Sequence, residues 1–241
     1  MRDRILILAA LAILVGGCGG GDGESVTTTS QAPPTTSTST TALASACDTA
    51  AKPSGAASQS KFDADVDGDG RADEVRLLLV GDSDWHLHVT LAAVGTADVA
   101  LAVLGSEAVS ILGGADVDGD GAQEIWARTG AGASATIIGL VRFADCSLTQ
   151  VTFSNGNPAE FPIGGSVGTA SGLECAAGAD HPDLTAYTAT SSGDDQYDVE
   201  ATAYALEDSV LTRIGTTTSR VSNRDPAFMR ATSFACGSLT F

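Results

Sequence analysis

The chain has 241 residues, with 12 Lys and Arg against 30 Asp and Glu, and its formal net charge is −18. A surface with this charge repels nucleic acid and anionic lipid headgroups, so it excludes nucleic-acid-binding proteins and leaves cations as favoured partners. Hydrophobic residues make up 43% of the chain and the acids cluster in loops between apolar segments, which excludes a wholly disordered protein. The length is sufficient for one substantial domain or two small ones.

The first 17 residues are predicted to be an export signal. Arg2 and Arg4 form a short basic region, and an apolar run from Ile5 to Val15 follows. This run is too short to span a bilayer, which favours a cleaved signal over an anchor. The residues Val15-Gly-Gly-Cys18 resemble the lipobox of a bacterial lipoprotein. The resemblance implies that Cys18 carries a lipid, is the first mature residue, and holds the protein at the extracytoplasmic face of a bacterial membrane.

Residues 18–58 are predicted to be a lipidated, flexible tether. They are mostly Gly, Ser, Thr, Ala and Pro with few large apolar side chains, so they cannot bury a core. A flexible chain of about 40 residues has a root-mean-square reach of roughly 35 Å. Residues 59–241 are therefore expected to form a folded domain that stands away from the membrane.

Two acidic stretches, 65–73 and 116–124, share one spacing. Each has carboxylates at relative positions 1, 3, 5 and 9 and a glycine at position 6, a pattern that bends a loop around a hard cation with oxygen ligands. The implied ion is Ca²⁺, one in each loop, with a main-chain carbonyl at position 7 as a further ligand. The predicted ligands are Asp65, Asp67, Asp69, Arg71 (carbonyl) and Asp73 in the first loop, and Asp116, Asp118, Asp120, Ala122 (carbonyl) and Glu124 in the second.

The flanking residues argue against an EF-hand. An EF-hand needs a bidentate Glu at position 12 and helices on both sides, but position 12 is Arg76 in the first stretch and Ala127 in the second. Apolar, β-forming runs follow instead, at 75–80 and 125–129. A DxDxDG loop, an acid at position 9 and then an apolar strand resemble the FG-GAP or VCBS type of repeat. The resemblance implies a loop that joins two strands of a propeller blade, as in integrin-like and many bacterial surface proteins. The alternative is a solvated acidic turn, which two in-register copies disfavour.

Beyond these loops the chain consists of short apolar runs separated by Gly, Asp and Ser turns, with no long helical period. The predicted class is therefore all-β. The further predicted strands are 85–91, 99–104, 109–112, 135–143, 148–153, 184–189, 197–204 and 210–214.

A third repeat is predicted around Asp183. Glu124 follows Asp73 by 51 residues, and Asp183 follows Glu124 by 59. Segments 145–151 and 208–214 also match, at an offset of 63, and both predict a hairpin turn before an outer strand. A period of about 50 to 60 residues suits a four-stranded blade, so we predict a β-propeller-like array of about three four-stranded repeats, with a compact β-sandwich as the alternative. The third copy lacks the carboxylates of positions 1, 3 and 5, which are Cys175, Ala177 and Ala179.

Four cysteines remain beside Cys18. An even number in an exported protein predicts two disulfides, with three possible connectivities. The favoured pairs are Cys47 with Cys146 and Cys175 with Cys236, because each ties a terminal segment to an internal repeat. The second pair would act as a clasp where the third loop lacks its calcium ligands. A metal site is the alternative, and the absence of CxxC spacing disfavours it.

Two further motifs resemble sites of catalysis or transition-metal binding. Gly164-Gly-Ser166-Val-Gly168 fits the G-x-S-x-G pattern of a hydrolase, with His181 downstream, but no helix is predicted after it, which favours a Gly-rich loop. His86 and His88 share one face of a strand. No third ligand is evident there, so two exposed residues on a hairpin are predicted rather than a metal site. A separate acidic turn, explained by solvation, is predicted from Asp194, Asp195 and Asp198.

These observations predict a lipid-anchored, extracytoplasmic, calcium-binding β-repeat protein that is not an enzyme and has a binding or envelope-structural role. The expected cofactor is Ca²⁺ at two sites. The expected partners are the membrane, through the lipid on Cys18, and an envelope protein or glycan. The alternative is a cell-envelope hydrolase that uses Ser166 and His181, in which calcium only supports the fold.

Overall fold

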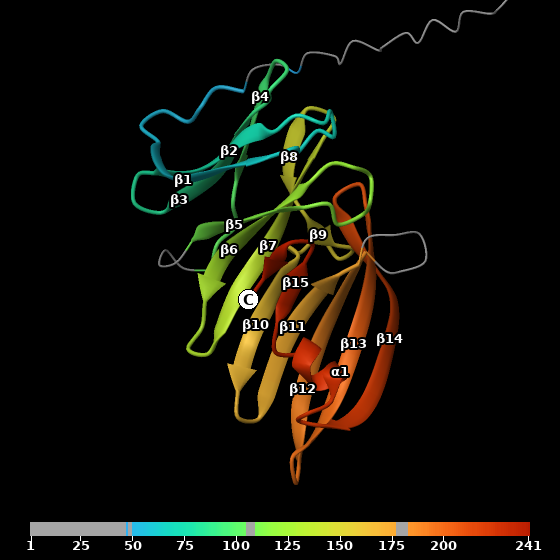
Figure 1. Cartoon of the computed structure of the whole chain (residues 1–241). Helices are drawn as coiled ribbons and strands as arrows, with labels where there is room; N and C mark the ends of the chain where they lie inside the picture. Colours follow the sequence, from blue (N-terminus) through green and yellow to red (C-terminus); the bar gives the residue numbers. More distant parts are fainter. Residues whose placement is uncertain (1–46, 48–49, 105–108, 177–182) are drawn as a thin grey trace, which may run out of the picture. The chain divides into compact units, whose positions relative to one another are not determined.

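The computed structural model describes residue 47 and residues 50–104, 109–176 and 183–241 (Figure 1). In these ranges the regular secondary structure is almost all β-strand, which confirms the predicted class. The signal, Cys18, most of the tether, Ala177, Ala179 and His181 lie outside the described residues. No helix in the described part of the chain is both long and apolar enough to cross a membrane.

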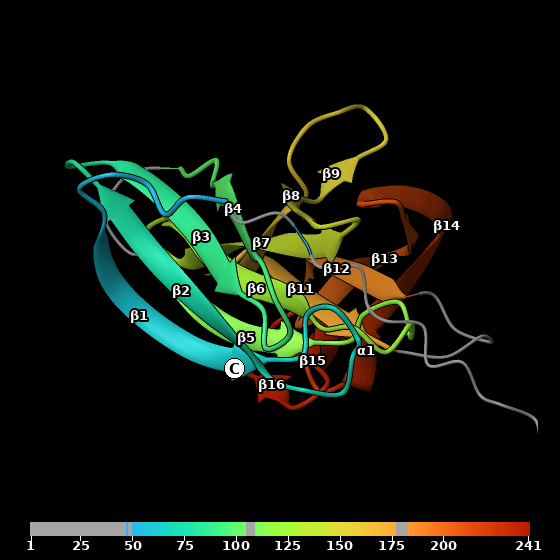
Figure 2. The same ribbon diagram turned by 90° about the horizontal axis from the view of Figure 1, so that it is seen from above.

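The first four strands form a sheet of their own, in sequence order and antiparallel throughout (Figure 2). Its strands are β1 (Ala57–Ala64), β2 (Asp73–Val80), β3 (Asp84–Thr90) and β4 (Thr96–Ala100). Apolar side chains alternate along β2, where Val75 and Leu77 are buried in the core and Arg76 between them is not. This period of two is what a half-buried strand requires.

The remaining strands form one twelve-stranded sheet. Its main path runs β5-β6-β7-β10-β11-β12-β13-β14-β9, while β8 also pairs with β7, β15 with β11, and β16 with β15. The bounds are β5 (Ser110–Ala115), β6 (Glu124–Ala131), β7 (Ala135–Ala144), β8 (Ser147–Gln150), β9 (Thr152–Phe153), β10 (Glu160–Ser166), β11 (Thr169–Cys175), β12 (Leu184–Gly193), β13 (Gln196–Glu207), β14 (Val210–Ser222), β15 (Phe234–Cys236) and β16 (Leu239–Thr240). A short helix, α1 (Pro226–Arg230), follows β14.

Three groups of four consecutive strands are each paired antiparallel in order: β1–β4, β5–β8 and β11–β14. The predicted propeller-like array is nevertheless wrong, because the second and third groups are not separate blades. Strand β10 pairs with β7 on one side and β11 on the other, and so joins the two groups into one sheet that does not close. The alternative prediction, a β-sandwich, is compatible with this arrangement.

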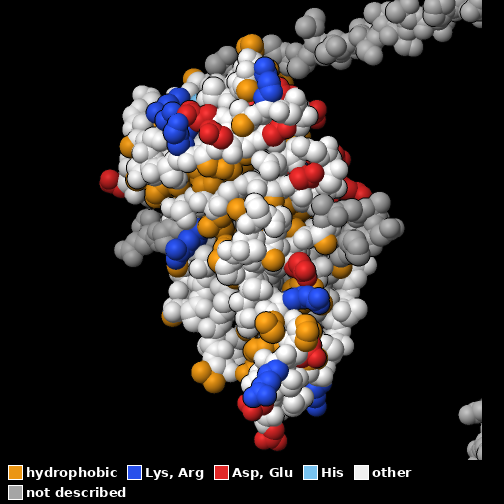
Figure 3. Space-filling model, in the orientation of Figure 1, with side chains coloured by type: hydrophobic (Ala, Val, Ile, Leu, Met, Phe, Trp, Pro, Cys, Tyr) orange, Lys and Arg blue, Asp and Glu red, His pale blue; other side chains and the backbone are white. Residues whose placement is uncertain are grey.

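Two hydrophobic cores meet at β6. Ile125 and Ala127 belong to a core shared with β2 and β3 of the small sheet, whereas Trp126 between them belongs to a second core. In the second core Trp126 packs edge-on against Phe234, with ring centroids 5.2 Å apart. On the face seen in Figure 3, hydrophobic side chains gather between the small sheet and the start of the large one. Glu124 therefore begins a strand that is packed on both faces.

Both favoured disulfides are formed, Cys47–Cys146 and Cys175–Cys236. The first joins residue 47 to the turn between β7 and β8, and the second joins the end of β11 to β15. Cys47 N also donates to Val94 O at 3.2 Å. Among the described residues, contacts with the folded body are thus present already at Cys47, ahead of residue 59, where the sequence predicts the domain to begin.

The two matched turns have the same geometry, as predicted. Asp145 and Cys146 connect β7 to β8 with φ of 48° and 60°, and Asp208 and Ser209 connect β13 to β14 with φ of 47° and 65°. Positive φ at both central residues defines a type I′ hairpin turn, whose twist suits antiparallel strands. Asp194 and Asp195 form a third such turn, between β12 and β13.

Candidate metal centre

The two acidic loops occupy equivalent places in the fold. The first connects β1 to β2 and the second connects β5 to β6, so each lies in the first hairpin of a four-strand group. Position 9 is the first residue of the second strand in both cases, Asp73 in β2 and Glu124 in β6. The sequence spacing and the topology therefore agree on the same repeat unit.

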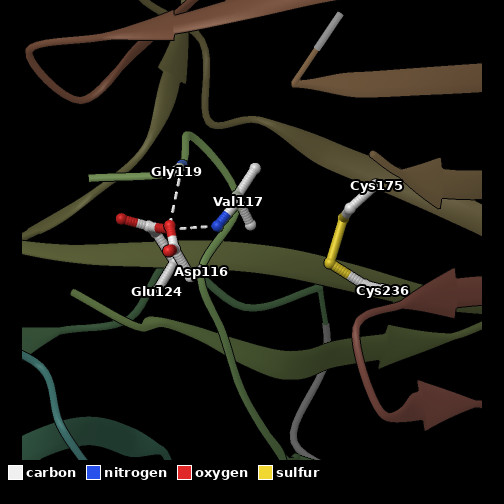
Figure 4. Close-up of a disulfide and its surroundings, with 6 residues drawn as sticks. All are labelled: Asp116, Val117, Gly119, Glu124, Cys175 and Cys236. Carbon is white, nitrogen blue, oxygen red and sulfur yellow. Dashed lines mark hydrogen bonds between the residues drawn. A yellow bond between two sulfur atoms is a disulfide. The ribbon is translucent and has the colours of Figure 1, made fainter. Parts of the chain in front are cut away.

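Four hydrogen bonds shape both loops in the same way. The carboxylate of position 1 accepts from the backbone N–H of position 6, position 3 accepts from position 5, and position 5 accepts from position 7. The acid of position 9 accepts from the N–H of position 2, Val66 N to Asp73 Oδ2 at 2.9 Å and Val117 N to Glu124 Oε2 at 2.8 Å. Figure 4 shows the latter bond and a further one from Gly119 N to Asp116, beside the Cys175–Cys236 disulfide. Such turns use Asp side chains as acceptors and glycines at positive φ.

These hydrogen bonds fix the loop carboxylates in place and bring three of them close together in each loop. In each loop the carboxylates of positions 1, 3 and 9 supply oxygens that all lie within 4.8 Å of one another. Position 5 is not part of either cluster: Asp69 pairs with Arg71 Nε at 3.1 Å, and Asp120 pairs with Arg142 Nη2 at 2.8 Å. The clusters that could hold a metal ion are Asp65, Asp67 and Asp73, and Asp116, Asp118 and Glu124.

The electrostatics of the second cluster suit a cation. Glu124 is 1% exposed, and burial raises the pKa of its carboxyl to about 8, with Asp118 and Asp120 acting in the same direction and the Val117 N–H opposing them. Its Oε1 is buried and accepts no hydrogen bond from any residue that the structure describes. Burial also raises the pKa of Asp67 and Asp118. A hard cation would pair the free oxygen and lower these pKa values again, so a donor set of carboxylate oxygens fits Ca²⁺.

The third repeat keeps only the structural part of this arrangement. Asp183 directly precedes β12, as expected for position 9, and its Oδ2 accepts from Leu206 N at 2.7 Å. In the first repeat the corresponding bond runs from Ala92 N to Asp73 Oδ1 at 2.8 Å. Cys175, at position 1, is in the disulfide with Cys236. In the first and third repeats the acid of position 9 thus accepts from a backbone N–H in or just after the third strand, with or without the other carboxylates.

Substituting Asp183 with Ala should lower the free energy of unfolding by about 1–3 kcal/mol, because the buried Leu206 N–H loses its acceptor. Thermal unfolding of the variant, in calcium and in chelator, measures the loss. The loss should be equal in the two conditions since no cation is involved. The exposed neighbour Glu207→Ala is the control, with a change of about 0.5 kcal/mol or less. A loss confined to calcium would contradict the purely structural role.

The two histidines of β3 lie in a more enclosed place than predicted. His88 is only 6% exposed, so the prediction of two exposed residues is wrong. Asp98 on β4, which the sequence reasoning missed, lies 2.7 Å from His86 Nδ1 and 3.4 Å from His88 Nδ1. It was missed because this contact depends on the β3–β4 register, which pairs His88 with Asp98. The short turn between the two strands could have indicated their register, and with it the position of Asp98 beside the histidines.

Ser166 does not lie on a strand-turn-helix. It ends β10 and leads through a tight turn into β11, with its Oγ 3.4 Å from Thr169 Oγ1. The Gly-rich loop that the sequence favours is therefore present, as the turn between β10 and β11. His181, the residue that would pair with Ser166 in a hydrolase, lies outside the described residues. Asp198 lies in β13 rather than in the acidic turn and forms an ion pair with Arg220 at 2.7 Å.

Comparison of the chain with protein-family models, with curated proteins and with solved structures finds no match in any of the three. The resemblance to FG-GAP or VCBS repeats therefore depends on the residues of the two loops.

Proposed function

We propose that the protein is a lipid-anchored, extracytoplasmic, calcium-binding β-repeat protein whose role is binding or envelope structure rather than catalysis. The observation that carries the calcium part is the pair of three-carboxylate clusters at the same place in two repeats, formed by the same hydrogen bonds. Two independent loops that converge on one geometry are better explained by a shared ligand than by solvation. Ca²⁺ suits them because all the predicted donors are oxygens.

The extracytoplasmic location is supported by the two disulfides together with the signal-like N-terminus. The net charge of −18 favours cationic or neutral partners over nucleic acid. An envelope protein or a glycan is the partner class that this location offers. The loops at the ends of the strands are the surfaces that would contact it.

Calorimetric titration of the purified full chain with Ca²⁺ tests the proposal. The expected stoichiometry is two ions per chain, and Mg²⁺ should bind more weakly because it prefers a smaller, strictly octahedral site. A stoichiometry near zero would overturn the calcium assignment. Capture of envelope components by the chain, with calcium and with chelator, then tests whether the loops support partner binding.

Changing Cys18 to Ser should release the protein from the membrane fraction, because the lipid and not the apolar run is the proposed anchor. Fractionation and immunoblotting measure the distribution, and the size of the product shows whether the signal is removed. Ser25→Ala, in the same tether, should stay with the membrane as the wild type does. A correctly cleaved Cys18→Ser protein that remains membrane-bound would contradict lipid anchoring.

A further inference from the structure

One arginine enters the second acidic loop from the neighbouring strand. Arg142 lies on β7, and its Nη2 is 3.1 Å from Asp118 Oδ2 and 2.8 Å from Asp120 Oδ2. Its Nε is 3.7 Å from the buried Oε1 of Glu124. The Arg142 side chain is only 15% exposed, so its charge acts through a partly desolvated space where electrostatic effects are stronger than in water.

Arg142 and a cation would compete for the same oxygens. Asp118 and Glu124 belong both to the contacts of Arg142 and to the cluster that could hold a metal ion. Yet the guanidinium does not satisfy the site, because Glu124 Oε1 and Arg142 Nε are both buried without a hydrogen-bond partner among the described residues. A bound ion would complete the coordination of this buried carboxylate, which belongs to the cluster and has one oxygen that accepts no hydrogen bond.

The first loop has no equivalent arginine. The strand register shows which residue takes its place. The residue after the position-9 acid is Glu74 in the first repeat, where it pairs with Thr90, and Ile125 in the second, where it pairs with Val141. The residue that follows this partner is therefore Leu91 in the first repeat and Arg142 in the second. Leu91 is 7% exposed and carries no charge. Among the described residues, no Lys, Arg or His lies within ion-pair distance of the three carboxylates Asp65, Asp67 and Asp73. In the described part of the chain Arg71 forms an ion pair with Asp69 alone, and its side chain is 54% exposed.

We propose that Arg142 is a resident counter-charge that lowers the Ca²⁺ affinity of the second loop, so that the two loops fill at different calcium concentrations, the first loop before the second. This inference rests on the proposed calcium-binding function. Without calcium, Arg142 neutralises part of the second loop, whereas the first loop keeps its carboxylate repulsion. When Ca²⁺ enters the second loop, the guanidinium leaves Asp118 and Glu124 or remains beside the ion and repels it. Both routes weaken binding.

Calorimetric titration of the full chain with Ca²⁺, comparing wild type with Arg142→Gln, tests the proposal. The wild type should show two binding steps of unequal affinity. In the variant the weaker step should tighten by about tenfold, since a unit charge about 5 Å from a divalent ion changes its binding by this order even in a water-like dielectric. Arg220→Gln is the matched control, because it also removes one arginine paired with an aspartate, Asp198, but outside both loops. Its exposed charge should change the affinity of either step much less.

If Arg142→Gln does not fold, an NMR titration of the wild-type protein tests the same proposal. The Nε–H signal of Arg142 in ¹⁵N NMR spectra, assigned by its absence in Arg142→Lys, should shift during the second calcium step and stay unchanged during the first. Two binding steps with no change in Arg142→Gln, or with an Arg142 signal that follows the first step, would overturn this inference and leave the calcium function intact. Failure of both loops to bind Ca²⁺ in wild type and variant would overturn the two proposals together.

Discussion

Replacing Cys175 and Cys236 together with Ala should lower the free energy of unfolding by about 4 kcal/mol. The disulfide spans 61 residues, so it removes considerable loop entropy from the unfolded chain. For a domain of this size the loss corresponds to a decrease in the melting temperature of about 8–16 °C. Calorimetric melts of wild type and double variant at one calcium concentration measure it, and equal melting temperatures would contradict a stabilising clasp.

The pair Cys47 and Cys146 serves as the comparison. Its span of 99 residues gives a similar entropic effect on the unfolded chain. However, among the described residues the segment near Cys47 is otherwise held at the start of the domain by hydrogen bonds such as Cys47 N–H to Val94 O and Ala50 N–H to Thr96 O. When this disulfide is removed, the segment around residue 47 can detach and regain conformational freedom in the folded state, which offsets part of the loss. We therefore expect a smaller decrease in melting temperature than for Cys175 and Cys236.

The features that could be predicted from the sequence are those encoded locally. The spacing of the carboxylates predicts the two loops. The sequence match between the segments at Asp145 and Asp208 predicts that both are hairpin turns. Strands with alternating or continuous apolar residues, such as β2, β6 and β7, were also found at nearly their actual bounds. In each case the pattern and the structure depend on residues within about ten positions of one another.

The strands that were missed have weak local signals. Strand β1 is mostly polar and lies at a sheet edge, and β11 contains Gly172, where a Cβ would collide with the carbonyl of Arg230. Strand β10 contains Pro162, at a point where β10 pairs with β7 and not with β11. Because β10 is the strand that joins two repeats into one sheet, missing it led directly to the wrong propeller arrangement. Helix α1 did have a signal, Asp225 as N-cap followed by Pro226.

The candidate metal centre likewise has one part that the sequence predicts and one part that it does not. The carboxylate clusters depend on spacing within one loop, and three of the four predicted carboxylates of each loop come together. Arg142 depends on the β6–β7 register, which no feature of the second loop reveals. The sequence therefore predicts the two loops as equal, whereas the structure distinguishes them by a contact from a neighbouring strand.

Calcium at ~10 mM should stabilise the folded chain by about 1.4–2.7 kcal/mol per loop, given extracellular-type dissociation constants of about 0.1–1 mM. Two loops then raise the melting temperature by roughly 6–20 °C over the value in chelator. The physical reason is that the three carboxylates of each cluster repel one another in the folded state, whereas the unfolded chain separates them. A bound ion removes this repulsion and binds only the folded form.

Asp67→Asn and Asp118→Asn assign the effect to each loop. The Asn side-chain oxygen can still accept the backbone N–H that each aspartate now accepts, from Asp69 and Asp120 respectively, so the turn is kept while one anionic ligand is lost. Each variant should lose its own share of the calcium-induced shift, and the double variant should lose nearly all of it. Asp84→Asn, which removes an exposed acid of β3 outside both loops, controls for net charge and should keep the full shift. If the double variant responded to calcium as strongly as the wild type, the stabilisation would come from nonspecific screening of the −18 charge, and the two clusters would have no part in it.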